Sequence, residues 1–242
     1  MTQPSTNGGT PASSGRTPAQ GNRLDPWYDV YAERAHNLRA SEIRALFSVV
    51  SRPEVVSLAG GMPNLKDLPL DRLAASAEKL IRNHGAQAMQ YGSGQGWEVL
   101  RERITEVMGY DGIVGADPDD VVVTTGSQQA LDLVTELFVN PGDVILAEAP
   151  SYVGALGVFR ARQADIVHVP MDEHGIIPEA LEGTSRSVRA WGRTIKFIYI
   201  IPNYHNPAGV TLSAERRPII AEICLREHVL IVEDNPYGLL GF

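Results

Sequence analysis

Four short polar segments, each following an apolar stretch, contain the side chains best suited to chemistry. Gly126-Ser127-Gln128 opens a predicted helix. A helix N-terminus offers free N–H groups and the positive end of a dipole, which suit a phosphate. Ser127 could equally be a simple N-cap. Tyr152 follows a predicted strand and could stack on a flat ring, with an ordinary buried tyrosine as the alternative.

Two further segments follow later predicted strands. The segment PNYHNPAG, residues 202–209, has a turn-forming composition. Turn formation does not explain why Asn203, His205 and Asn206 crowd one strand end. Asp234 ends another apolar strand. Its carboxylate could pair with a cationic ring nitrogen and keep that nitrogen protonated, with a turn or capping aspartate as the alternative.

Short apolar stretches alternating with amphipathic stretches predict the elements that position these segments. We expect strands at 120–125, 143–148, 166–169, 196–201 and 229–233. We expect helices at 41–50, at 70–83 with Gly85 as the stop, from Trp97, at 127–138, after Ser151, and at 214–227. This alternation indicates an α/β fold with a mostly parallel sheet and helices on both faces. Ligands bind at the carboxyl ends of such strands.

Composition narrows the class of protein. The 242 residues are 43% hydrophobic and 21% charged, which is typical of a folded globular protein. The net charge of −8 disfavours nucleic-acid and anionic-membrane partners. Apolar stretches are too short to span a bilayer, and one cysteine excludes an internal disulfide framework. Because the first residues contain no apolar run, we expect no signal peptide. We expect a cytoplasmic protein with a disordered tail at residues 1–23 and no metal site.

Six motifs in order resemble one family. They are SLAGGMP, QYGSGQG, TTGSQQALDL, EAPSYVGAL, PNYHNPAG and VEDNPYG. Together they resemble the class I pyridoxal-phosphate (PLP) aminotransferases, most closely the 2-aminoadipate, kynurenine and aromatic aminotransferase subgroup. The resemblance implies the PLP-dependent transferase fold. It also implies an N-terminal arm and the start of a small domain at 24–64, and an incomplete PLP-binding large domain at 65–242.

The resemblance assigns cofactor-binding roles to eight residues: Gly126, Ser127, Gln128, Tyr152, Asn206, Asp234, Tyr237 and Tyr91. The first three would hold the phosphate, and Tyr152 would stack on the pyridine ring. Asn206 and Tyr237 would bind the ring hydroxyl, and Asp234 would pair with the ring nitrogen. Tyr91 would reach the phosphate of a neighbouring subunit's cofactor, which implies a homodimer.

The resemblance also assigns substrate-binding residues. Gly61 and Asn206 would lie against the substrate, with Gly61 at its carboxylate. Ser41 and Arg44 match a helix that touches the substrate side chain in the subgroup. Arg44 could bind a distal carboxylate, since guanidinium pairs well with carboxylates, and a solvated arginine is the alternative.

Two parts of the family pattern find no match. The family holds PLP as a Schiff base to a lysine a few dozen residues after the ring-nitrogen aspartate, and none of Lys66, Lys79 and Lys196 fits. The arginine that binds the substrate carboxylate is also unmatched. We expect the front part of an aminotransferase that transfers an amino group from an amino acid to a 2-oxo acid, such as 2-oxoglutarate. We expect it to end before the sheet and the small domain are complete, and to be inactive alone.

Four alternatives stay open at this point. A PLP-dependent lyase, decarboxylase or acyltransferase would share these motifs. A non-enzymatic PLP-binding effector domain, as in some bacterial regulators, would share them too. A nicotinamide-dependent oxidoreductase would need a glycine fingerprint that TTGSQQ does not supply. The chain could also be a fragment without a function of its own.

Overall fold

A computed structural model describes residues 25–37, 52, 54–56, 65 and 67–241. The chain divides into two units, residues 1–37 and 38–242. The described part of the first unit holds two 3-10 turns, η1 (Tyr28–Val30) and η2 (Glu33–Asn37). The predicted tail at 1–23 and the predicted helix at 41–50 lie outside the described residues. So do Ser41, Arg44 and Gly61.

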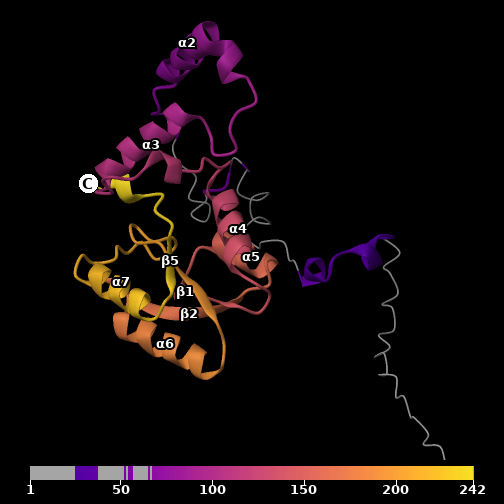
Figure 1. The fold of residues 1–242 in the computed structure, drawn as a ribbon, viewed down its shortest axis with the longest axis vertical. Coiled ribbons are helices and arrows are strands. Elements are labelled where there is room, and N and C mark those ends of the chain that lie inside the picture. The colour runs from indigo at the N-terminus through magenta and orange to yellow at the C-terminus, as the bar shows by residue number, and fades with distance from the viewer. Residues whose placement is uncertain (1–24, 38–51, 53, 57–64, 66, 242) are drawn as a thin grey trace, which may run out of the picture. The chain divides into compact units, whose positions relative to one another are not determined.

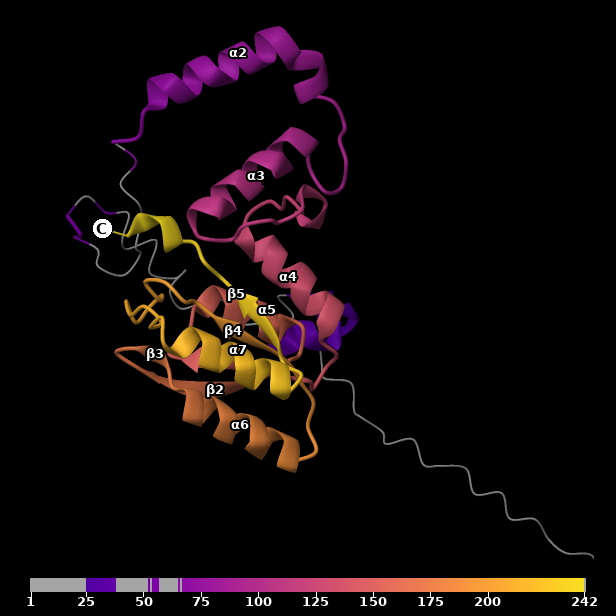
Figure 2. The same ribbon diagram turned by 60° about the vertical axis from the view of Figure 1, so that its left-hand side comes forward.

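The second unit contains a five-stranded sheet in the order β3-β2-β1-β4-β5. Figure 1 labels β1, β2 and β5, and Figure 2 labels β3 and β4 as well. The strands are β1 (Val144–Ala149), β2 (Asp165–Asp172), β3 (Gly175–Ile176), β4 (Ile195–Ile200) and β5 (Leu230–Glu233). All neighbouring strands are parallel except the short β2–β3 pair. The predicted mostly parallel sheet is therefore confirmed.

Four helices cover both faces of this sheet: α4 (Ser127–Phe138), α5 (Val153–Ala161), α6 (Pro178–Ala190) and α7 (Arg216–Arg226). Two further helices, α2 (Leu70–Ala88) and α3 (Glu98–Tyr110), precede them in the chain and contribute no residue to the core on either face. Side chains of a strand alternate between its faces. In β1, Val144 and Leu146 pack with α6 and α7, whereas Ile145 and Ala147 pack with α4 and α5. Figure 2 shows α6 and α7 on one side of the strands and α4 on the other.

The strand register brings three strand ends to one edge of the sheet. Ala147 in β1 is paired with Tyr199 in β4, and Tyr199 with Val232 in β5. Asp234 N–H continues the ladder by donating to Ile200 O at 2.9 Å. The polar segments after β1, β4 and β5 therefore begin side by side.

Two local predictions are wrong. Residues 120–125 form no strand. Their start belongs to the 3-10 turn η3 (Pro118–Asp120), and the rest is extended without a hydrogen-bonded strand beside it. Gly85 does not end its helix, because α2 continues to Ala88. The backbone departs from helical angles one residue earlier, at His84 (φ −136°, ψ 20°), and the helix resumes after it.

Candidate functional site

A cavity of about 110 Å³ lies at the carboxyl edge of the sheet. It is lined by Ser127, Tyr152, Ile201, Asn206, Asp234, Pro236 and Tyr237. These residues come from the starts of α4 and α5 and from the segments after β4 and β5. The structure thus brings five of the eight predicted cofactor residues into one small cavity, although they lie up to 110 positions apart in the sequence.

The start of α4 borders this cavity. Gly126 is the N-cap residue, with a φ of 94° that favours glycine, and no side chain of the described residues caps the helix. Ser127 is the first helical residue and lines the cavity, so the alternative of a simple N-cap at Ser127 does not hold. The first N–H groups of a helix have no partner within it. This end of α4 therefore suits an anionic group such as a phosphate.

Side chains fix the loop that leads into α4. The side-chain oxygen of Gln129 accepts from Thr125 N at 2.7 Å and from Thr125 Oγ1 at 2.8 Å. Gln128 Nε2 donates to Gly154 O at 3.3 Å, linking the start of α4 to the start of α5. The Gln128 side chain is therefore engaged beside the cavity rather than in its lining.

Tyr152 lies against a glycine that sequence reasoning missed. A Cβ added at Gly154 would lie 2.5 Å from the ring and hydroxyl of Tyr152. Only a residue without a side chain lets the ring take this place. The signal in the sequence was a glycine two positions after an aromatic residue at a strand end, which turn chemistry alone does not require.

A buried tyrosine holds the carboxyl group of Asp234. The Tyr199 hydroxyl donates to Asp234 Oδ2 at 2.6 Å. Tyr199 is fully buried and meets Phe159 edge to face, with ring centroids 5.4 Å apart. Burial, and then the hydrogen bond to Asp234, raise the pKa of Tyr199 above its ordinary value of 10, so the phenol stays a donor. No hydrogen bond from the described residues occupies the other oxygen, Asp234 Oδ1.

A second polar network braces the segments after β4 and β5. Asn203 Nδ2 donates to Asn235 Oδ1 at 2.9 Å, and Arg217 donates to Asn203 Oδ1 at 2.8 Å. Asn235 Nδ2 in turn donates to the carboxyl group of Asp111, at the end of α3. Sequence analysis singled out Asn203 but missed its partners Asn235, Arg217 and Asp111, because they come from other parts of the sequence.

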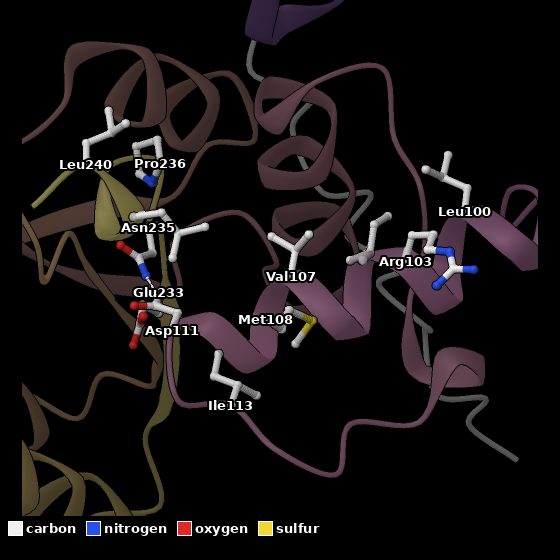
Figure 3. Close-up of a pocket in the computed structure, with 12 residues that line it drawn as sticks. Leu100, Arg103, Val107, Met108, Asp111, Ile113, Glu233, Asn235, Pro236 and Leu240 are labelled. Atoms are coloured by element: carbon white, nitrogen blue, oxygen red, sulfur yellow. Dashed lines mark hydrogen bonds between the residues drawn. The ribbon is translucent and has the colours of Figure 1, made fainter. Parts of the chain in front are cut away.

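A larger groove of about 660 Å³ includes Glu233 of β5 in its lining (Figure 3). Its lining is mostly apolar and comes from α3 and from the segment after β5. It includes Leu100, Val107, Met108, Ile113, Pro236 and Leu240. Glu233 faces this groove, whereas the next residue, Asp234, faces the small cavity. Burial raises the pKa of Glu233, with Arg217 opposing the shift and Asp111 adding to it.

Other residues singled out in the sequence lie elsewhere. Tyr91 is 96% exposed and does not line the cavity. Lys79 lies in α2. Lys196 is the second residue of β4, and its Nζ lies 3.3 Å from Asp143 Oδ2, at the opposite end of the sheet from the cavity. Lys66 lies outside the described residues. Within the described ranges, no cluster of His, Cys, Asp and Glu could hold a metal ion.

Comparison with known proteins decides the family. A model of the family "Aminotransferase class I and II" matches residues 53–242. The chain belongs to this family. It is 38% identical over 212 residues to the aromatic-amino-acid aminotransferase 1 of Thermococcus litoralis, covering 88% of this chain and 51% of that protein. It is 34% identical over 216 residues to the 2-aminoadipate transaminase of Thermus thermophilus, covering 89% and 52%.

A solved structure agrees with this assignment. The kynurenine aminotransferase of Pyrococcus horikoshii, crystallised in complex with PMP, matches with a TM-score of 0.82 and 34% identity. The match covers 89% of this chain and 53% of that one. The predicted fold, family and subgroup are confirmed, and pyridoxal phosphate is confirmed as the cofactor of the family. The chain spans about half the length of the curated relatives it matches. No helix among the described residues is long and apolar enough to cross a membrane.

Proposed function

We propose that this chain supplies the cofactor-binding part of a PLP-dependent aminotransferase that transfers an amino group from an amino acid to 2-oxoglutarate or another 2-oxo acid. One observation supports this most strongly. The start of α4, an aromatic ring, an amide and a carboxyl group converge on one cavity, through Ser127, Tyr152, Asn206 and Asp234. Phosphate, flat ring, hydroxyl and ring nitrogen each have a matching partner in this donor set.

The proposed roles follow from chemistry and position. PLP, when bound, supplies an electron sink for the bond that breaks at the α-carbon of the substrate. Asp234 would pair with the ring nitrogen through the oxygen that Tyr199 leaves available, and would keep a proton there. Tyr152 would lie against the ring, and Ser127 with the first N–H groups of α4 would hold the phosphate. Asn206 and Tyr237 would orient the ring through its hydroxyl.

Further parts of the proposal concern the whole protein. The names of the relatives favour an aromatic amino acid or 2-aminoadipate as the amino donor. Gly61, Ser41 and Arg44 would contact that substrate. Tyr91, whose side chain is free at the surface, would serve the cofactor of a second subunit in a homodimer. A cytoplasmic location also stays a proposal.

Titration with PLP tests the proposed cofactor site. Asp234→Asn keeps the size of the side chain and an oxygen for Tyr199, but removes the charge that would meet the ring nitrogen. Because hydrogen bonds to charged groups contribute about 1.5–3 kcal/mol, we expect the Kd for PLP to rise roughly 10- to 150-fold. Fluorescence quenching or the absorbance of bound PLP measures this value.

The neighbouring acid provides a matched control. Glu233→Gln makes the same chemical change one residue earlier, in the groove rather than the cavity. It should leave the Kd within about twofold, a change of roughly 0.4 kcal/mol. Equal Kd values for Asp234→Asn and the wild-type chain, or no binding by the wild-type chain, would contradict the proposed site.

A further inference from the structure

A carboxyl group and an imidazole lie buried against each other beside the cavity. Glu148 in β1 and His205 after β4 are each 1% exposed. Glu148 Oε2 lies 3.1 Å from His205 Nε2. None of the roles proposed above uses either side chain. Burying polar groups costs free energy unless partners satisfy them, so this pair is a candidate for a specific positioning role.

The contacts of His205 indicate which ring nitrogen bears the proton. Ala208 N–H donates to Nδ1 at 3.3 Å, so Nδ1 must offer a lone pair. In a neutral imidazole the proton is then on Nε2. That nitrogen lies beside Glu148 at ion-pair distance, although it forms no well-aligned hydrogen bond with any described residue. The ring therefore connects the backbone of its own loop to the end of β1.

Glu148 holds the same loop at a second point. Its Oε2 also accepts from Ile201 N, the first residue after β4, at 2.8 Å. Within the loop, His205 N–H donates to Val210 O at 2.8 Å. One carboxyl oxygen thus contacts both the beginning of the loop and the imidazole in its middle.

Asn206 lies immediately after His205 and lines the cavity. Its side chain makes no hydrogen bond to any described residue, so no contact of its own fixes it. Its position must come from the backbone on either side. That backbone is fixed by the ring of His205, through Ala208, and by Glu148.

We propose that Glu148 and His205 are positioning residues that set the place of Asn206 in the cavity. This inference rests on the proposed function, in which Asn206 contacts the hydroxyl of the cofactor ring. Neither side chain needs to touch the cofactor. Through this pair, the end of β1 holds the loop after β4 in place, and with it the side-chain amide of Asn206.

Two variants of Glu148 in the full chain test this proposal. Glu148→Leu keeps a similar volume and removes the acceptor, whereas Glu148→Gln keeps an acceptor oxygen. Amide hydrogen exchange at Ala208 reports the hold on the loop, and the Kd for PLP reports the position of Asn206. For Glu148→Leu we expect both to rise about tenfold, corresponding to the loss of one buried hydrogen bond. Glu148→Gln should restore both to within about threefold of the wild-type values.

A double-mutant cycle separates positioning from a general loss of stability. If the pair acts through Asn206, Glu148→Leu should raise the Kd in the wild-type background but not in an Asn206→Ala background. Thr135→Val is the matched control. It removes another buried hydrogen bond, to Leu131 O at 2.6 Å in α4, and should change neither the exchange of Ala208 nor the Kd.

Each outcome decides the inference. Unchanged exchange of Ala208 in Glu148→Leu would overturn it, as would an equal rise in Kd with and without Asn206. If the wild-type chain binds no PLP, the proposed function fails, and the exchange of Ala208 alone then decides whether the pair holds the loop. If Glu148→Leu does not fold, His205→Leu is measured in its place. It removes the contact between the pair and the acceptor of Ala208 N–H but leaves Ile201 N bonded to Glu148, so the Kd with and without Asn206 is then the deciding readout.

Discussion

Two stretches of similar sequence adopt different structures in this molecule: one is a central strand and the other is not a strand. IKFIYI becomes β4, between two parallel neighbours, and its Phe197, Ile198 and Tyr199 are fully buried. VVVTT at 121–125 has the same apolar and β-branched character but forms no strand. Val122 is 56% exposed, and Val123 N bonds only to Gln95 O, outside any sheet.

The difference shows that an apolar, β-branched sequence forms a strand only where another strand is available to pair with it. β-propensity measures how well side chains fit a pleated, half-buried surface, and that surface exists only beside other strands. β4 finds it on both sides, and its carboxyl end consequently positions functional side chains. The 121–125 stretch leads into α4, yet it has no such neighbour among the described residues.

Truncating a side chain to alanine should show the largest difference in stability cost between β4 and residues 121–125. Phe197→Ala removes a ring packed edge to face on Phe159, so we expect unfolding to become about 3–5 kcal/mol easier. Val122→Ala should change the free energy of unfolding by no more than about 0.5 kcal/mol, as for most exposed sites. Urea denaturation followed by circular dichroism measures both. A cost at Val122 that approaches the cost at Phe197 would show that residues 121–125 are packed after all.

Glycine replacements should distinguish the two regions next. In Gly154→Ala the new Cβ would meet the Tyr152 ring, and the required shift should cost about 1–3 kcal/mol and weaken PLP binding. Gly109→Ala in α3 meets nothing within 4 Å and should stabilise the chain by up to about 1 kcal/mol, because alanine favours helices. Gly157→Ala is the control within α5, also in open space. Stabilisation by Gly154→Ala would mean that Tyr152 is not held against this glycine.

Removing one ion pair from each of two regions should give the smallest difference in stability, and that difference should depend on pH. Arg216 binds Asp172 through two hydrogen bonds, at 2.6 and 2.8 Å, and lowers the pKa of Asp172 to about 2. Arg103 and Glu106 on α3 form a more exposed pair that also lowers the pKa of its carboxyl group. A lowered pKa stabilises the fold above the unfolded-state pKa, and the effect is lost as pH falls through the folded-state pKa.

Asp172→Asn should therefore lower the urea midpoint at pH 7. Its difference from the wild-type chain should shrink below about pH 4 and close near pH 2. Glu106→Gln should lower the urea midpoint less than Asp172→Asn does at every pH, since the side chains of Arg103 and Glu106 are both more than half exposed. A pH-independent difference for Asp172→Asn would assign its effect to packing rather than to the ion pair.

Patterns local in the sequence predicted most of the sheet and part of the site. Apolar stretches of strand length gave β1, β2, β4 and β5, and the rule that ligands bind at strand ends pointed to Ser127, Asn206 and Asp234. Of the residues that hold them, His205 was noticed in the sequence, but Tyr199 and Glu148 were not. Tyr199 meets Asp234 across 35 positions, and Glu148 meets His205 across 57. Such pairs depend on the register between strands, which no short window of sequence contains.

The opposite orientations of Glu233 and Asp234 make the site sensitive to strand slippage. The two acids are consecutive, and a slip of β5 by one residue against β4 would exchange them, turning Asp234 to the groove and Glu233 to the cavity. Because glutamate is one methylene longer than aspartate, its carboxyl group would lie further from the backbone and would not meet the Tyr199 hydroxyl where that of Asp234 does. The hydrogen bond between Asn203 and Asn235 joins the segments after β4 and β5 and therefore favours the observed register.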